Sequence, residues 1–190
     1  MEKSETRRIT WDIASKAGLV LGGVSIAYLL VNMIMPTTKS IAVGALISLL
    51  GIVLWAAKFF GCIWLMKFFM KKLVAADPDT TNSDTFRLGM IIAVLSALIY
   101  AAFYLLYTSV ISPDIFNESL ALVQEQYATI MPAESLEAIE NMNFPVMGFF
   151  SQLIYCSLFG IVLSAILSRS IPSNDPFADY KSDQNTNENL

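Results

Sequence analysis

One basic side chain interrupts a long apolar run, and its charge is the first feature that suggests chemistry. Lys58 lies within the run that begins at Ile41 and reaches its basic end near Lys67. A charge inside a membrane-spanning segment is costly and requires a partner or a route to water. Counting about 1.5 Å per residue places Lys58 about 26 Å along the segment, close to its inner boundary, and Asp12 falls at a similar level. We therefore expect either an Asp12–Lys58 ion pair or, as the favoured interpretation, a lysine that snorkels to the headgroups.

Tyrosine and amide side chains gather in the outer halves of the apolar runs, which are the halves away from the basic ends. Tyr100, Tyr104 and Tyr107 share one helical face. The complete set is Tyr28, Asn32, Tyr100, Tyr104, Tyr107, Gln152 and Tyr155. If they converge, they form an outward-facing polar-aromatic pocket for a small or cationic ligand. The favoured interpretation is instead an interfacial belt of tyrosines, with the two amides hydrogen-bonding between helices.

Small residues at intervals of four mark a packing face. Ala14, Gly18 and Gly22 lie on one side of the first apolar segment, where another helix backbone can approach closely. Packing within one molecule is favoured, and dimerisation through the same face is the alternative.

Enzymatic chemistry has little support in the residue inventory. The chain contains no histidine and two cysteines, Cys62 and Cys156, so the commonest general base and metal ligand is missing. No nucleophile has a base beside it, and no phosphate-binding loop occurs. We expect no catalytic residue, no cofactor and no metal site.

These residues must be positioned by membrane-spanning helices. The 190 residues are 55% hydrophobic and 15% charged, which is too apolar for a soluble domain of this size. We predict an all-α integral membrane protein in which residues 1–168 form a four-helix transmembrane domain. Each apolar run can cross a hydrocarbon core of about 30 Å. The expected helices span residues 11–35, 41–66, 86–111 and 144–168.

A polar segment separates the last two predicted helices. Residues 112–143 contain Pro113 and an amphipathic pattern of apolar residues that runs to Ile130, followed by Pro132 and a shorter helical stretch. We expect an acidic, extracytoplasmic helical insertion. Residues 169–190 are rich in Asn, Asp and Ser and predict a disordered cytoplasmic tail.

The distribution of basic residues predicts the orientation. Of the twelve Lys and Arg residues, all but Lys39 and Lys58 fall on one side of the four predicted helices. Basic residues accumulate on the cytoplasmic side of inserted helices. We therefore predict that both termini are cytoplasmic and that residues 112–143 are extracytoplasmic.

The order of these features resembles a known bacterial family. The shared features are the glycine-containing opening from Trp11 to Gly23, the basic end at Lys67–Lys72, the insertion from Pro113 to Asn143, and the exit Ile171-Pro172 followed by Asp175-Pro176-Phe177. In this order and length they resemble the membrane family called domain of unknown function 4199. The resemblance implies a multi-pass protein of the bacterial cytoplasmic membrane and supplies no site residue.

Two functional interpretations follow. The favoured one is a non-enzymatic envelope or accessory protein, whose partners are the lipid bilayer and either a second copy or another membrane protein. The alternative is a small transporter or ligand-binding subunit with an outward-facing pocket under the acidic segment. Nucleic acid is not expected as a partner.

The predicted orientation can be tested by fusing a topology reporter after Glu125. A reporter that is active only outside the cytoplasm should be active there, because residues 112–143 are expected to be translocated. Activity of a cytoplasm-specific reporter at the same position would contradict the prediction.

Overall fold

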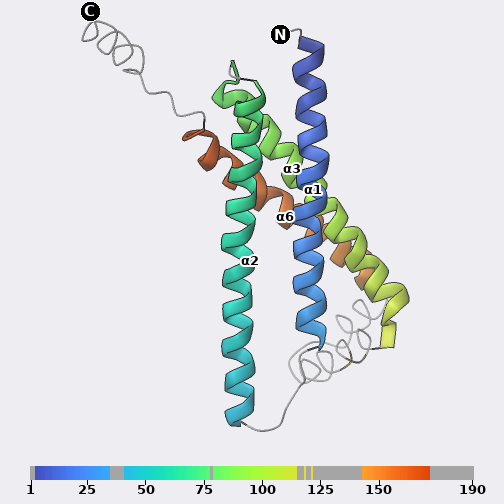
Figure 1. Cartoon of the computed structure of the whole chain (residues 1–190). Coiled ribbons are helices and arrows are strands. Elements are labelled where there is room, and N and C mark those ends of the chain that lie inside the picture. The colour runs from blue at the N-terminus through green and yellow to red at the C-terminus, as the bar shows by residue number, and fades with distance from the viewer. Residues whose placement is uncertain are drawn as a thin grey trace, which may run out of the picture.

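The structure, a computed structural model, describes residues 3–34, 41–77, 79–114, 118, 121 and 143–171. These residues form helices α1 (Lys3–Ile34), α2 (Ile41–Ala76), α3 (Asn82–Leu106) and α6 (Phe144–Ser168), with the π-helical turn η1 (Tyr107–Ile111) after α3 (Figure 1). Within the described residues, four helical segments are long and apolar enough to cross a membrane. The described part of the chain is therefore all-helical, and its four candidate spans indicate a multi-pass membrane protein.

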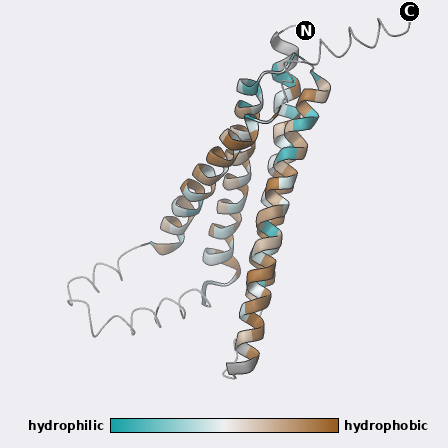
Figure 2. Cartoon of the chain, turned by 90° about the vertical axis from the view of Figure 1, so that its left-hand side faces the viewer, coloured by the Kyte–Doolittle hydropathy of each residue, from teal (hydrophilic) through white to brown (hydrophobic). Residues whose placement is uncertain are grey.

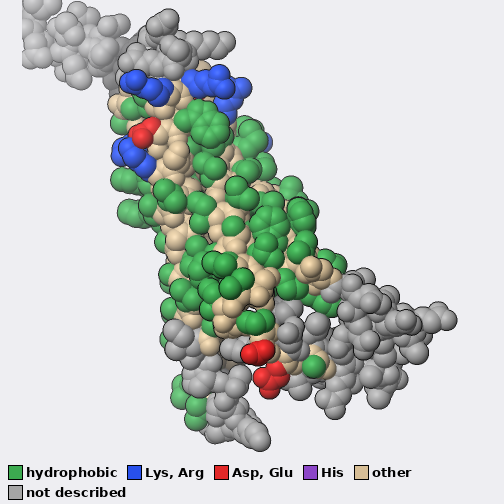
Figure 3. All heavy atoms as spheres, turned by 90° about the vertical axis from the view of Figure 1, so that its right-hand side faces the viewer, with side chains coloured by type: hydrophobic (Ala, Val, Ile, Leu, Met, Phe, Trp, Pro, Cys, Tyr) green, Lys and Arg blue, Asp and Glu red, His purple; other side chains and the backbone are tan. Residues whose placement is uncertain are grey.

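Successive helices run in opposite directions. The start of α1, the connection between α2 and α3, and the end of α6 consequently lie at one end of the bundle (Figure 1). Figure 2 shows apolar residues along the helices and more hydrophilic ones toward that end. Figure 3 shows Lys and Arg side chains gathered at that end and acidic side chains at the opposite one. Asp114 and Glu118 are exposed and follow η1 in the chain. Acidic residues such as Asp12 and Asp84 also lie at the end where Lys and Arg gather, so it is the described Lys and Arg residues, and not all charges, that lie mainly at one end.

The predicted helix boundaries hold best at α6, which spans residues 144–168 as expected. Asn143 caps it by accepting a hydrogen bond from the Val146 N–H, and Pro145 occupies its first turn. Helix α3 begins at Asn82, earlier than expected, because Thr81 and Asp84 form a reciprocal capping box. Most of the predicted insertion and of the predicted tail lies outside the described residues, so both remain predictions.

Helix α2 extends well beyond its predicted end at residue 66. It continues to Ala76 because its basic end is amphipathic: Met66, Met70 and Leu73 are fully buried while Lys67 is exposed. The Met70 side chain lies against Gly89 at the start of α3. The end of α2 is therefore part of the helix bundle.

Helices α3 and α6 approach most closely along a seam of small residues. A Cβ atom placed on Gly160 would lie 2.5 Å from the Ala93 Cβ, and one placed on Gly89 would collide with Ser164. The Ser164 hydroxyl donates a hydrogen bond of 3.0 Å to the Phe86 carbonyl oxygen. In lipid, where water does not drive helices together, such close packing and interhelical hydrogen bonding hold the pair.

The predicted packing face of α1 also contacts α3. Ala14 is fully buried, and Cβ atoms on Gly18 and Gly22 would lie 2.8 Å from the Leu95 Cβ and 2.9 Å from the Ile99 Cγ2. The face is therefore used within the molecule, as the favoured interpretation of these residues held. Helix α3 lies between α1 and α6 and is the centre of the bundle.

The close packing of α3 and α6 predicts that replacing glycine with alanine lowers stability at some positions and not at others. Gly160→Ala should destabilise the protein by about 1–3 kcal/mol, because the new Cβ overlaps Ala93 and both atoms are fixed to backbone. Gly51→Ala is the matched control, since a Cβ there meets nothing within 4 Å. The free energy of unfolding in mixed micelles measures both variants. Equal effects at the two glycines would contradict the close approach of α3 and α6.

Candidate functional site

The ammonium group of Lys58 lies between two tyrosine rings. Its Nζ is 4.8 Å from the ring centroid of Tyr28 on α1 and 5.4 Å from that of Tyr100 on α3. Both distances are within the range of about 6 Å in which a ring face attracts a cation. Three helices thus meet at one charged group.

The two rings explain how a lysine is tolerated at this position. A lysine at the centre of a membrane helix costs about 2.5–3.5 kcal/mol on the insertion scale. A desolvated cation–π contact contributes about 2 kcal/mol, so two such contacts are comparable with the cost. Tyr100 is 9% exposed, which keeps its ring away from competing solvent.

The depth of Lys58 differs from the sequence estimate. Lys67, an exposed residue of the basic end, lies nine residues further along α2, a rise of about 13 Å. Tyr28 lies twelve residues beyond the exposed Lys16 on α1, a rise of about 18 Å. Both values correspond to the middle of a hydrocarbon core of about 30 Å. The ammonium group lies against Tyr28 and Tyr100. Snorkelling to the headgroups stays a prediction.

The expected Asp12–Lys58 pair is not formed. Asp12 and Tyr28 are sixteen residues apart on α1, about 24 Å along the helix, so an ammonium beside Tyr28 is out of reach of Asp12. The Asp12 carboxylate instead pairs with Lys16 one turn away, at 2.7 Å, and both side chains are more than half exposed. A local surface ion pair replaces the predicted intramembrane one.

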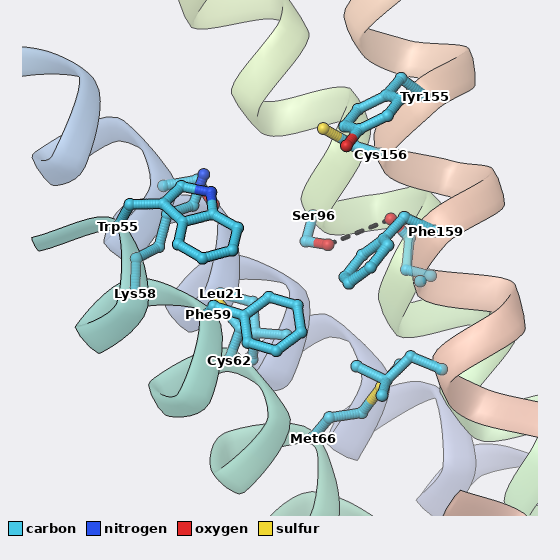
Figure 4. A pocket seen from close by; sticks show the side chains of 14 residues that line it. Leu21, Trp55, Lys58, Phe59, Cys62, Met66, Ser96, Tyr155, Cys156 and Phe159 are labelled. Atoms are coloured by element: carbon cyan, nitrogen blue, oxygen red, sulfur yellow. Dashed lines mark hydrogen bonds between the residues drawn. The ribbon is translucent and has the colours of Figure 1, made fainter. Parts of the chain in front are cut away.

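A pocket of about 190 Å³ opens beside Lys58, between α2 and α6 (Figure 4). Lys58 and Cys62 line it from α2, and Cys156 lines it from α6. Leu21 and Ser25 of α1, with Ala93 and Ser96 of α3, complete its wall. All four long helices therefore contribute to one cavity, which combines an amine, two thiols and the hydroxyls of Ser25, Ser96 and Tyr155 with apolar surface.

Aromatic side chains form the outer rim of this pocket. The rings of Phe59 on α2 and Phe159 on α6 have centroids 5.8 Å apart, and Trp55 stacks on Phe59 at 5.5 Å. Trp55 and Phe159 are 55% and 44% exposed, and Tyr155 beside them is 69% exposed. The rim therefore faces outward from the bundle, toward the region that lipid would occupy.

The seven predicted pocket residues do not form a single site. Tyr28 and Tyr100 meet at Lys58, and Tyr155 lines the pocket between α2 and α6. The others have separate positions: Tyr104 packs over Gly148, Tyr107 is buried in η1, Asn32 donates a hydrogen bond to the Tyr28 carbonyl oxygen, and Gln152 is half-buried on α6. Three of the seven thus lie at or beside Lys58 and its pocket, and the other four do not line that pocket. The burial of Tyr100 and Tyr107 does not fit an interfacial belt that includes every tyrosine.

Sequence reasoning missed the pocket itself. Cys62 follows Lys58 by one helical turn and must lie on the same face of α2, and this spacing was the available signal for one wall of the pocket. The sequence does not predict that this face of α2 lies opposite Cys156 and Ser96. Their positions around one pocket depend on the distances between the helices. Within the described residues, no group of three or more His, Cys, Asp or Glu side chains is placed to hold a metal ion.

The four apolar helices described above lie largely within a region that matches a known protein family. A family model described as protein of unknown function (DUF4199) matches residues 16–169. The chain belongs to this DUF4199 family. The match begins within α1 and ends just after α6, so it includes Lys58, both tyrosines that contact it and every residue that lines the pocket. No curated protein and no solved structure matches the chain.

The cation–π contacts predict specific energetic coupling in this DUF4199 protein. In double-mutant cycles, Lys58→Met with Tyr28→Leu should show a coupling of about 1–2 kcal/mol, because each substitution removes the same contact. Lys58→Met with Asp12→Asn should be additive and serves as the control. Unfolding free energies in micelles provide the measurement. Coupling to Asp12 but not to Tyr28 would contradict the site.

Proposed function

We propose that this protein is a binding protein of the membrane, whose ligand enters from the bilayer through the opening between α2 and α6. The observation that carries the proposal is the pocket beside Lys58, which has polar groups at its wall and an exposed aromatic rim. Ligand sites are characteristically concave and mostly apolar, with a few convergent polar groups. Ionisable groups within a membrane also mark functional sites by default.

The packing of the bundle supports an entry route from the side. Helix α6 packs tightly along α3 through Gly160, Ala93 and Ser164, and it faces α2 across the Phe59–Phe159 contact. Moving two aromatic side chains changes the width of that opening without disturbing the α3–α6 seam. A lipophilic molecule can therefore enter while the bundle stays assembled.

We also propose an orientation and a location. The end that carries Lys67, Lys71, Lys72, Arg87 and Arg169 faces the cytoplasm, following the preference of basic residues for that side. Both termini are then cytoplasmic, and residues 112–143 are extracytoplasmic. The cytoplasmic membrane of a bacterium is the proposed location.

An accessory role is the second candidate, and the surface of α2 favours it. Leu46, Leu49, Ile52 and Val53 are each more than half exposed on the part of α2 that precedes the pocket. This apolar surface suits contact with lipid or with another membrane protein. The proposed role is non-enzymatic in either case.

Filling the pocket should remove a bound ligand. Native mass spectrometry of protein purified in mild detergent should show a bound lipophilic molecule, which Ser25→Phe should displace because Ser25 lines the pocket. Val53→Phe is the control, since Val53 is 56% exposed and does not line it. Identical bound species in wild type and both variants would contradict the proposal.

A further inference from the structure

The charge of Lys58 is only partly compensated by the protein. Within the described part of the chain, no carboxylate pairs with it and no group accepts a hydrogen bond from it; its contacts are the two tyrosine rings. An ammonium group has three N–H donors. Ring faces attract the cation but do not supply the oxygen acceptors that these donors prefer. Because Lys58 lines the pocket and no described residue accepts a hydrogen bond from it, a ligand in the pocket can supply the missing acceptors.

We propose that the ligand is a long-chain carboxylate, whose head binds Lys58 while its tail extends between α2 and α6 into the bilayer. This inference rests on the proposed binding function and names its ligand class. A carboxylate brings one negative charge to one ammonium, so the pair is neutral in a region where unpaired charge is costly. It also supplies acceptor oxygens for the free N–H donors.

The depth of the site favours a carboxylate over a phospholipid. Lys58 lies about 13 Å from the level of Lys67, whereas phospholipid headgroups remain at the interface. A phosphate monoester would bring about −1.5 to −2 charges, which exceeds what a single lysine neutralises. A head group with one negative charge on a single alkyl chain can reach the depth of Lys58, and one lysine neutralises its charge.

The size of the pocket agrees with a ligand that is only partly enclosed. Its volume of about 190 Å³ is below the range of about 300–1,000 Å³ that encloses a drug-sized molecule. It can enclose the head and the first part of a chain. The remainder would pass the exposed rim formed by Trp55 and Phe159, where alkyl chains meet aromatic surface.

Trp55 provides a built-in probe, because it lines the pocket and only two other tryptophans, Trp11 and Trp64, occur in the chain. The experiment uses the full chain with Trp11→Phe and Trp64→Phe in phosphatidylcholine vesicles at about pH 8, where a carboxyl group is ionised. A dibrominated stearic acid and its methyl ester are titrated separately, and quenching of Trp55 fluorescence is measured.

The acid should quench saturably, with an affinity at least about ten-fold higher than that of the ester, because hydrogen bonds to charged groups are the stronger ones. Lys58→Met should abolish that preference, while Lys67→Met, which removes an exposed lysine from the same helix, should retain it. The comparison of acid with ester needs only the chain with Trp11→Phe and Trp64→Phe. It therefore tests the preference for a carboxylate even if Lys58→Met fails to fold.

The two proposals fail in distinguishable ways. Saturable quenching by acid and ester with equal affinity would overturn the carboxylate inference and leave the binding function standing. Equal loss of preference in Lys58→Met and Lys67→Met would also overturn the inference, because it would indicate a general surface-charge effect. Quenching that rises linearly with both probes, without saturation, would overturn the binding function itself.

Discussion

The close approach of α3 to its neighbours is the constraint on which the rest of the structure depends. Small side chains at Gly89, Ala93 and Gly160 let the α3 and α6 backbones come together, and Gly18 and Gly22 do the same for α1. Helices in lipid are held by such packing rather than by exclusion of water. With α1 and α6 fixed on α3, α2 joins the bundle through its buried basic end, which places Met66 and Met70 inside. The pocket lies where α2 and α6 remain apart.

Lys58 gives this pocket its chemical character. Tyr28 and Tyr100 come from helices that the small-residue seams hold in place, so the cation site follows from the same packing. Their ring faces offset part of the cost of a charge in the bilayer. Lys58 also lines the cavity, together with Ser96 and Cys156. A tolerated charge that has no carboxylate partner among the described residues is what a site for an anionic ligand requires.

The sequence predicted the fold more fully than the site. Apolar length located all four helices, and the spacing of Ala14, Gly18 and Gly22 identified a real packing face. The stripe Gly89, Ala93, Ala97 and Ala101 on α3 has the same spacing and was the missed signal for the central helix. Lys58 was recognised as unusual, but its two tyrosine partners were not predicted. The alternative Asp12 pair rested on counting from Ile41, which assumed that the membrane boundary coincides with the start of the helix. The continuation of α2 to Ala76 shifts that boundary.

The remaining errors concern rotation about helix axes and the distances between helices. Tyr100 and Tyr104 lie one turn apart on α3, yet Tyr100 meets Lys58 while Tyr104 meets Gly148 on α6. Periodicity gives the face of a residue but not which neighbour covers it. Cys62 and Cys156 line the same cavity because of how α2 and α6 pack. No residue pattern in a single sequence predicts that packing.

The proposed binding function depends on a lysine near the middle of the bilayer that lines a pocket between α2 and α6. An experimental structure in lipid nanodiscs tests it most directly. The Lys58 Nζ should lie within about 6 Å of the ring centroids of Tyr28 and Tyr100, with elongated density extending from it past Phe59 and Phe159. A Lys58 side chain directed to the basic end, or α2 packed against α6 without a cavity, would contradict the account.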